Sequence, residues 1–411
     1  MFKYINKNSF YFFAASIIEK IVFFTLFVIL ARSITTTEYG IVRTAFAFCN
    51  ILIVIFSFGF PVYIQRLAAS EANITKVVSD LISILLLVSF PIFLIAIIYF
   101  KFTLDVNTDV ILVITMNYTY IFINVFSAIL YGRENYKIVL RTVALPQLFL
   151  AIVLIFIFIF SPNKYLFLSV FLITQIIIGI LLFRIISPKN LKLFNFSLGN
   201  FELFRIIKLS LPLGISGIFV LIYDRVDIII IQNILDLNSV AVYAIAYGIY
   251  KAPQMISGAI LIPEFTILSR EYARNGIIKK ENILSVVIML LIISVFFLCL
   301  FYFFSTYIIQ IIYGEKYLRS IDILKFLSFG IPGVFLNNFT GVLSNSIRLE
   351  KISIYTTLAG VIINIVLSVY LIGIMGIWGV VTATIITEYI VFILQVILLY
   401  LKAVIRGIII I

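Results

Sequence analysis

The sequence has no histidine, only two cysteines and few charged residues, and each shortage excludes a class of chemistry. Cys49 and Cys299 stand in separate apolar runs, so neither a metal-ligand spacing nor a disulfide framework is present. We interpret both as buried small hydrophobic residues. Nucleotide-binding loops, nucleophile elbows and carboxylate pairs on a long polar loop are also missing. The sequence therefore predicts no catalytic residues, no metal site, no cofactor and no enzyme.

What the sequence does contain is hydrophobic residues, which make up 64% of its 411 residues against 12% charged residues. Soluble domains are closer to 45–50% apolar and about 25% charged. Apolar runs of about 20 residues, the length that crosses a ~30 Å hydrocarbon core, recur throughout. We therefore predict an all-α polytopic membrane protein with about twelve transmembrane helices. The expected spans are 10–31, 41–62, 78–100, 110–131, 139–161, 164–184, 209–233, 239–262, 282–312, 327–347, 352–373 and 376–401.

The net charge of +12 comes from basic residues scattered over the short segments between spans. They form no dense patch with interleaved aromatic residues, so nucleic acid is not an expected partner. If the N-terminus is cytoplasmic, 20 lysines and arginines lie on the inner side and six on the outer side. The positive-inside rule then places both termini in the cytoplasm.

A polar connector around residues 185–206 divides the predicted spans into two sets of six. We expect two lobes, 1–206 and 207–411. The lobes resemble each other at an offset of 204 residues, which predicts a parallel repeat of the kind found in alternating-access transporters. The corresponding pairs are Tyr39 with Tyr243, Asn50 with Gln254, and Arg66 with Arg270.

Charged residues inside the predicted spans are the main candidates for function, because a charge in the bilayer is costly and needs a reason to be there. Asp224, Arg225 and Asp227 lie in the seventh span, either lining a cavity or forming an ion pair that neutralises itself. Glu19 and Lys20 hold the matching place in the first span. Glu388 lies deep in the last span, where it could carry a proton or serve packing. The basic residues in the spans are Lys20, Arg43, Arg225 and Lys251.

Two polar stripes accompany these charges. Arg43 and Asn50 are seven residues apart on one helix face, although Arg43 could instead snorkel to the outer interface. Another stripe lies in the eighth span beside Lys251 and is either a platform for sugars or a packing and interface belt. Its members are Tyr243, Tyr247, Tyr250 and Gln254.

Several short motifs in a fixed order resemble the polysaccharide flippase branch of the multidrug, oligosaccharidyl-lipid and polysaccharide exporter superfamily. They cover most of the chain. The motifs are Ala31-Arg32 through Glu38-Tyr39-Gly40, Gly59-Phe60-Pro61 leading to Arg66, Pro212 through Asp224-Arg225-Val226-Asp227, Val242-Tyr243 through Pro263, Tyr313-Gly314-Glu315-Lys316-Tyr317, and Asn364 through Gly376, Gly379 and Glu388.

This resemblance implies two six-helix lobes around a central cavity and a multi-pass protein of the bacterial cytoplasmic membrane. It also implies a substrate with an undecaprenyl-pyrophosphate anchor that carries repeat units for O-antigen or capsule, with a polysaccharide polymerase and a chain-length regulator as partners beside membrane lipid. We expect Lys20, Arg43, Arg225, Lys251, Asn50, Tyr247 and Gln254 to bind substrate, and Glu19, Asp224, Asp227 and Glu388 to be candidates for ion coupling.

Other functions stay open at this point. A peptidoglycan-precursor or teichoic-type flippase and a multidrug exporter have the same general architecture. A membrane-embedded polysaccharide polymerase belongs to a different class, and such enzymes generally carry reactive arginines or carboxylates on a large outer loop. The longest outer segment expected here, near residues 313–326, is short, which argues against a polymerase.

Overall fold

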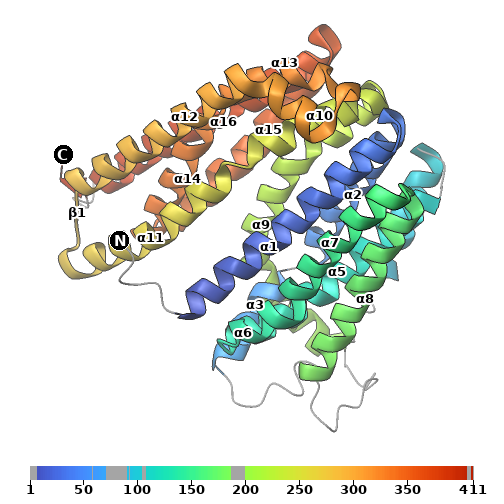
Figure 1. The fold of residues 1–411 in the computed structure, drawn as a ribbon. Helices are drawn as coiled ribbons and strands as arrows, with labels where there is room; N and C mark the ends of the chain where they lie inside the picture. The colour runs from blue at the N-terminus through green and yellow to red at the C-terminus, as the bar shows by residue number, and fades with distance from the viewer. Residues whose placement is uncertain are drawn as a thin grey trace. The chain divides into compact units, whose positions relative to one another are not determined.

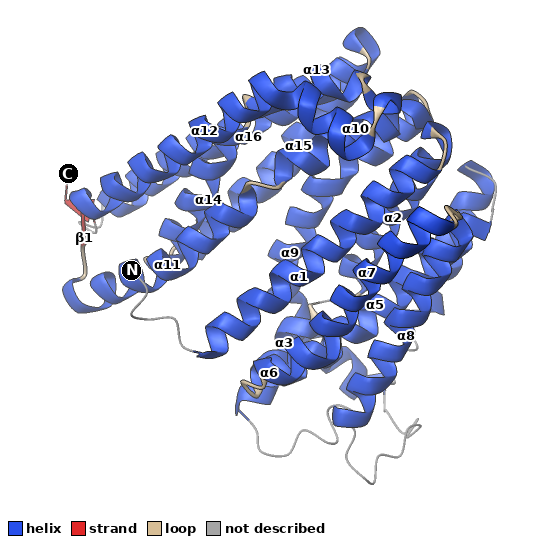
Figure 2. Ribbon diagram, in the orientation of Figure 1, coloured by secondary structure: helices blue, strands red, loops and turns tan. Residues whose placement is uncertain are grey.

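The computed structural model describes residues 7–57, 59–70, 90–91, 93–103, 108–186, 200–404 and 409–410. These residues are almost entirely helical (Figure 2). The strands found among them are two short segments, β1 (Ile278–Lys279) and β2 (Ile409–Ile410). They pair in parallel, with Ile278 opposite Ile409.

The chain divides into two compact units, Met1–Leu221 and Ile222–Ile411, and the dividing point falls inside helix α9 (Asn200–Ile234). In the first unit, α5 packs against α2, α3 and α8, while α1 packs along α7 (Figure 1). Its elements before α9 include α1 (Lys7–Ser33), α2 (Thr36–Phe56), α3 (Phe60–Ser70), α5 (Thr108–Gly132), α6 (Tyr136–Val139), the π-helical η2 (Leu140–Ala144), α7 (Leu145–Phe160) and α8 (Lys164–Ile186).

The second unit begins with the C-terminal part of α9. Helix α14 packs against α11, α12 and α16, and α15 pairs closely with α16. Its other elements are α10 (Leu237–Lys251), α11 (Gln254–Asn275), α12 (Lys280–Tyr313), the 3-10 turn η3 (Glu315–Tyr317), α13 (Arg319–Ser328), α14 (Ile331–Ser346), α15 (Glu350–Met375), α16 (Ile377–Leu399) and the π-helical η4 (Tyr400–Val404).

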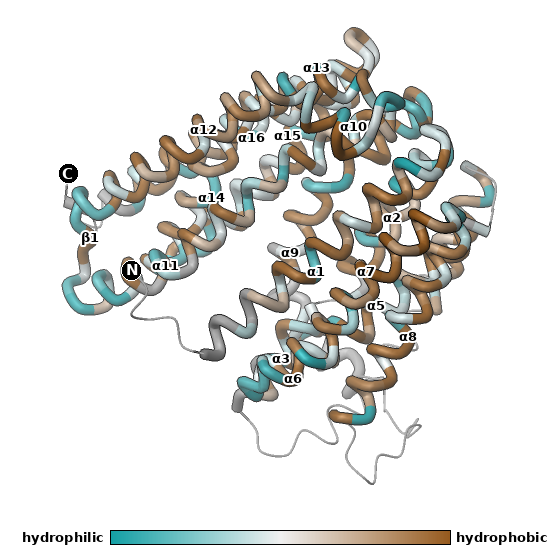
Figure 3. Tube along the Cα trace, in the orientation of Figure 1, coloured by the Kyte–Doolittle hydropathy of each residue, from teal (hydrophilic) through white to brown (hydrophobic). Residues whose placement is uncertain are grey.

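The predicted all-α polytopic membrane class is confirmed. Among the described residues, eight helices are long and apolar enough to cross a membrane, and the pair α13 and α14, bent by 46°, could form a ninth span. Large apolar side chains such as Phe149, Phe303 and Ile311 are exposed, as expected for a surface that faces lipid. Hydrophobic residues cover α7, α8 and α12, and hydrophilic residues gather at turns such as the one from α11 to β1 (Figure 3).

Much of the third predicted span, 78–100, and much of the connector 185–206 lie outside the described residues. A count of twelve spans and the lobes 1–206 and 207–411 therefore stay predictions.

Three sequence-based expectations differ from the structure. The eighth predicted span, 239–262, is interrupted between α10 and α11, where Pro253 has no N–H to continue the helical hydrogen bonds. The expected outer loop at 313–326 contains most of α13, a helix that buries Ile323, Leu324 and Leu327. Cys299 is exposed instead of buried, because it lies on the outward face of α12, where lipid takes the place of a protein core.

Capping side chains position the helices that carry polar residues. At the start of α2, the backbone N–H of Glu38 donates to Thr35 Oγ1 at 3.2 Å, and the N–H of Thr35 donates to Glu38 Oε2 at 2.9 Å. At the start of α10, the N–H of Ser239 donates to Asp236 Oδ1 at 2.7 Å. Because each cap satisfies a backbone group that the helix leaves open, α2 and α10 begin at defined residues.

A tight turn joins α15 to α16 and holds the two helices close together. Gly376 has a φ of +59°, a conformation that side chains disfavour. A Cβ on Gly379 would lie 2.3 Å from the backbone carbonyl carbon of Leu371. The two helices can therefore approach this closely only because position 379 is glycine.

We expect Gly379→Ala to lower the amount of folded protein in membranes several-fold, since the added methyl group must push the backbones of α15 and α16 apart. Gly373→Ala is the matched control on the same helix pair, because a Cβ there meets no atom within 4 Å. Quantitative immunoblotting of membranes measures both. Equal amounts of the two variants would contradict the close approach at Gly379.

Candidate functional site

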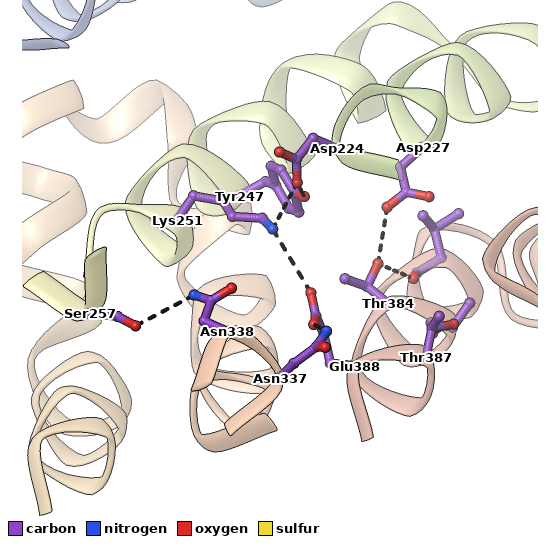
Figure 4. Close-up of polar contacts among 12 residues, drawn as sticks. Asp224, Asp227, Tyr247, Lys251, Ser257, Asn337, Asn338, Thr384, Thr387 and Glu388 are labelled. Atoms are coloured by element: carbon purple, nitrogen blue, oxygen red, sulfur yellow. Dashed lines mark hydrogen bonds and ion pairs between the residues drawn. The ribbon is translucent and has the colours of Figure 1, made fainter. Parts of the chain in front are cut away.

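The centre of the candidate site is the ammonium group of Lys251, at the end of α10. Its Nζ lies 2.8 Å from Asp224 Oδ1 and 3.8 Å from Glu388 Oε1 (Figure 4). Asp224 comes from α9 and Glu388 from α16, so three helices of the second unit meet at one cation. The side chain of Lys251 is 18% exposed, that of Asp224 32% and that of Glu388 3%.

Aromatic rings surround the same ammonium group. Lys251 Nζ lies 5.3 Å from the centre of the Tyr247 ring, 5.8 Å from that of Tyr223 and 5.9 Å from that of Tyr250. The faces of these rings attract a cation. Tyr247 also donates its hydroxyl to Asp224 Oδ1 at 3.2 Å, which holds the carboxylate beside the lysine.

Asp227 forms a second cluster one turn further along α9. Its Oδ2 accepts hydrogen bonds from the Tyr243 hydroxyl at 2.6 Å and from Thr384 Oγ1 at 3.0 Å. Ser368 Oγ is 3.5 Å from Oδ1 of the same carboxylate. Asp227 is only 2% exposed. The carboxylate is thus held by hydroxyl groups from α10, α15 and α16.

Polar contacts continue from Glu388 along α16. Asn337 of α14 donates its amide to Glu388 Oε2 at 3.2 Å. Gln395 accepts a hydrogen bond from Thr340 of α14 and donates to Thr356 Oγ1 of α15 at 3.2 Å. These polar side chains of α14, α15 and α16 therefore satisfy one another inside an apolar unit.

Helical spacing explains why these residues meet. Asp224 and Asp227 are three residues apart on α9, and Thr384 and Glu388 are four apart on α16, so each pair lies on one helix face. The face of α16 that bears Thr384 and Glu388 is its buried face. The sequence left two readings for Asp224, Arg225 and Asp227: a group that lines a cavity, or an ion pair that neutralises itself. The structure adds an ion pair between Asp224 Oδ1 and Lys251 of the neighbouring helix.

The other predicted site residues of the second unit take different places. Arg225 lies between the two aspartates in α9 and is half-buried. Gln254 was expected to continue the polar stripe of α10. It is instead the first residue of α11, because the helix is interrupted before it. Tyr243, Tyr247 and Tyr250 share α10, and the rings of Tyr243 and Tyr247 stack with centres 5.4 Å apart.

In the first unit, Arg43 of α2 is buried, with 7% of its surface exposed. Its guanidinium carbon lies 4.3 Å from the centre of the Phe27 ring, and we find no ion pair for it within the described residues. Asn50 donates its amide to the Phe46 carbonyl at 2.6 Å, so this side chain is used within its own helix. On α1, Glu19 is half-buried and Lys20 exposed.

Sequence reasoning did not find Thr384 and Ser368 as partners of Asp227. Threonine and serine are common in apolar helices, where the hydroxyl can bond to the backbone one turn earlier, so the residue type alone carries little signal. Thr384 also makes that backbone bond, to the Val380 carbonyl at 2.9 Å. The available signal was its spacing of four residues from Glu388.

Comparisons with known protein families agree with this architecture. The family described as "Polysaccharide biosynthesis protein" matches residues 5–263, and the family MatE matches residues 212–370. The chain is 27% identical over 325 residues to an uncharacterized membrane protein of Methanocaldococcus jannaschii. That match covers 71% of this chain and 60% of the relative, so the chain spans about 60% of the relative's length.

Solved structures of transporters have the same fold. An inward-facing multidrug resistance MATE family transporter of the MOP superfamily is similar with a TM-score of 0.74 and 14% identity, over 94% of this chain and 95% of that one. The lipid II flippase MurJ in an inward closed conformation has a TM-score of 0.69 and 18% identity, over 94% and 87%. Since the first family match covers more than half of the sequence, the chain belongs to the polysaccharide biosynthesis protein family.

Proposed function

We propose that this protein flips undecaprenyl-pyrophosphate-linked oligosaccharide repeat units across the bacterial cytoplasmic membrane for the synthesis of O-antigen or capsule. The observation that carries the proposal is the family match over residues 5–263. Support comes from buried or half-buried cations in apolar helices, because a pyrophosphate needs positive charge that neutral polar groups do not supply.

The substrate-binding residues we propose are charged or polar groups of both predicted lobes, 1–206 and 207–411. Arg225 and Arg43 bring planar guanidinium groups, which suit the two oxygens of a phosphate better than an ammonium group does. Asn50, Tyr247 and Gln254 offer hydrogen bonds to sugars. The cations proposed to neutralise the pyrophosphate are Lys20, Arg43, Arg225 and Lys251.

In this proposal, transport proceeds by alternating access, with the polyprenyl tail remaining in lipid while the head group crosses the membrane within the protein. A transporter without coupling only equilibrates its substrate, so net export follows from consumption of the product or from an ion gradient. The carboxylates proposed to couple an ion are Glu19, Asp224, Asp227 and Glu388. A polymerase and a chain-length regulator on the outer side then use the product.

Both termini are expected in the cytoplasm, because 20 of the basic residues fall on that side of the predicted topology. Cysteines introduced singly at positions 195 and 279 should react in intact cells only with membrane-permeant maleimide. A cysteine at position 163, between α7 and α8, should react with the impermeant reagent as well. The background variant replaces Cys49 and Cys299 by serine. Labelling of position 195 from outside would overturn this topology and the lobe boundary together.

Flipping is tested directly in proteoliposomes that contain a fluorescent undecaprenyl-pyrophosphate-linked oligosaccharide. We expect the protein to bring inner-leaflet substrate into reach of an external lectin or glycosidase about tenfold faster than empty vesicles do. Arg225→Lys should retain part of the rate, because lysine keeps the charge and loses the paired donors of guanidinium. A rate equal to that of empty vesicles would contradict the proposal.

A second candidate is multidrug export, which the MatE match over residues 212–370 favours. The same vesicles loaded with a cationic dye separate the two, since an exporter of drugs moves the dye and a flippase moves the glycolipid. Replacing the glycan by a peptidoglycan precursor or a teichoic-type polymer tests the remaining flippase functions. Transfer of sugar by the purified protein would instead indicate a polymerase.

A further inference from the structure

The end of the second unit where α11 stops and α12 starts carries exposed basic residues (Figure 3). Helix α11 ends at Gly276, which has a φ of +69°, and β1 leads directly into α12. Strand β1 pairs with β2, and β2 contacts η4, so segments far apart in the sequence meet at this corner. The exposed basic residues on these elements, which we call the basic corner, are Arg270, Arg274, Lys279, Lys280 and Lys402.

Among the described residues, the carboxylates beside these cations are those of Glu271 and Glu281. Glu271 accepts the backbone N–H of Lys279 at 3.1 Å and the amide of Asn282 at 2.8 Å, so its oxygens join the end of α11 to the start of α12. Within the described part of the chain we find no ion pair for Lys279 or Arg274. The basic corner therefore keeps a net positive charge.

Exposed apolar residues continue from the cations along both helices. On α12, Lys280, Leu284 and Ile288 follow one another at intervals of four residues, so they share one helix face. On α11, Ile267 lies one turn before Arg270. Leu284 is 51% exposed, Ile288 47% and Ile267 51%. Positive charge followed by an apolar face is the arrangement that complements a phospholipid, whose anionic phosphate lies above apolar chains.

We propose that the basic corner binds the head group of an anionic phospholipid such as phosphatidylglycerol, with an acyl chain along Leu284 and Ile288. Clusters of about four or more basic residues directly beside a membrane helix are typical of sites for anionic lipid. A soluble phosphate would use the cations alone and leave the apolar face unused, so the lipid is the ligand that fits both. This site does not depend on which substrate the protein transports.

Basic residues on the cytoplasmic side of a membrane protein also fix its topology, and that role needs charge but no bound ligand. A lipid site differs from it in two measurable ways. It selects an anionic head group over a zwitterionic one, and the selection is confined to the basic corner. The experiment must therefore report on lipid at one place on the protein surface.

Quenching of tryptophan fluorescence by brominated lipids measures the preference at one place. Trp378 is the single tryptophan of the sequence, so Trp378→Phe with Leu284→Trp leaves one reporter, four residues from Lys280. The full-length protein is reconstituted in phosphatidylcholine with increasing fractions of brominated phosphatidylglycerol. We expect phosphatidylglycerol to bind about fivefold or more tightly than phosphatidylcholine brominated in the same way, which is the effect of one or more basic residues at a membrane surface.

Variants of the reporter protein make the result specific. Removing three charges of the basic corner should abolish the preference, whereas Lys279→Arg with Lys280→Arg should keep it. Removing three exposed charges from the predicted outer side is the matched control and should also keep it. The three changes in the basic corner are Arg274→Gln, Lys279→Gln and Lys280→Gln, and those of the control are Lys101→Gln, Lys316→Gln and Arg319→Gln.

The unaltered protein gives a second control, because Trp378 lies at the start of α16 and η4 follows the end of that helix. Quenching of Trp378 should show no preference for phosphatidylglycerol. Equal quenching by the two lipids at position 284, or an equal loss of preference in both triple variants, would overturn the lipid site. Reversal of the quenching by soluble glycerol phosphate would overturn the lipid as the ligand. If Leu284→Trp is not recovered, Ile288→Trp is the reporter.

Discussion

Replacing Lys251 by glutamine and Asp224 by asparagine in one protein is expected to leave its abundance near normal while export of surface glycan falls about tenfold to 100-fold. The two amides can hydrogen-bond to each other in place of the 2.8 Å ion pair, and Glu388, which loses the ammonium at 3.8 Å, keeps the hydrogen bond from the Asn337 amide. The positive charge that we propose for the substrate is lost, and a hydrogen bond to a charged group contributes about 1.5–3 kcal/mol. Surface glycan is measured in a host that lacks its own flippase gene.

The single change Lys251→Ala should also lower the abundance of the protein, because it leaves Asp224 and Glu388 without the ammonium. Breaking a buried pair from one side costs about 3–5 kcal/mol, and the partial exposure of Asp224 puts the expected effect at the lower end. From the sequence alone, Lys251 has no carboxylate within one turn of its own helix, which predicts near-normal abundance for this variant. The contact across helices reverses that expectation for abundance.

Normal export by the Lys251→Gln, Asp224→Asn protein would mean that the pair serves packing only. For Arg225, the corresponding test is Asp224→Asn with Arg225→Gln, and normal export by that variant would remove the substrate-binding role proposed for Arg225. Protein amounts in membranes are compared in each case, so that a loss of export is not mistaken for a loss of protein.

Asp227→Ala is expected to reduce the amount of folded protein strongly. The change removes the acceptor of the Tyr243 hydroxyl, and a buried donor left unsatisfied costs about 1–3 kcal/mol, whereas Thr384 keeps the Val380 carbonyl as an acceptor. Asp227→Asn should be much milder for abundance, since an amide oxygen still accepts from both hydroxyls. If Asp227 also couples an ion, the asparagine variant loses export while its abundance remains. Immunoblotting of membranes and surface glycan assays measure the two effects.

Asp322→Ala provides the matched control for loss of a carboxylate. Its side chain is 66% exposed and lies 3.6 Å from Lys325, and exposed ion pairs contribute about 0–1 kcal/mol. We expect near-normal abundance and export. Equal losses for Asp322→Ala and Asp227→Ala would show that the hydroxyl cluster around Asp227 has no special structural role.

Residue types alone predicted the membrane class and the places in the chain where charge would matter. Long apolar runs leave only helices as a way to satisfy the backbone in lipid, so the class follows from composition. A charge inside such a run is conspicuous for the same reason. This is how Asp224, Asp227, Lys251 and Glu388 were found before any fold was known.

Sequence reasoning was weakest where a helix bends and where helices meet. The interruption at Pro253 was missed because proline is tolerated within membrane helices, so its presence alone does not end a span. Helix α13 was read as a loop because its polar residues mask a buried apolar face. Both errors arise because packing against neighbouring helices decides where a helix is interrupted and whether a polar segment is helical, and a local sequence pattern does not contain that packing.

By itself, the sequence determined that this is an all-α membrane protein and which ionisable residues lie in its apolar helices, since both depend on the cost of exposing polar groups to lipid. Only the tertiary structure decided which charges meet. Helical periodicity relates residues of one helix, so it put Asp224 and Asp227 on one face of α9 and gave Lys251 no carboxylate partner on its own helix. The packing of α9, α10 and α16 brings Lys251 between Asp224 and Glu388, which lie 27 and 137 positions away in the sequence. A pattern within one helix cannot relate residues that are so far apart in the chain.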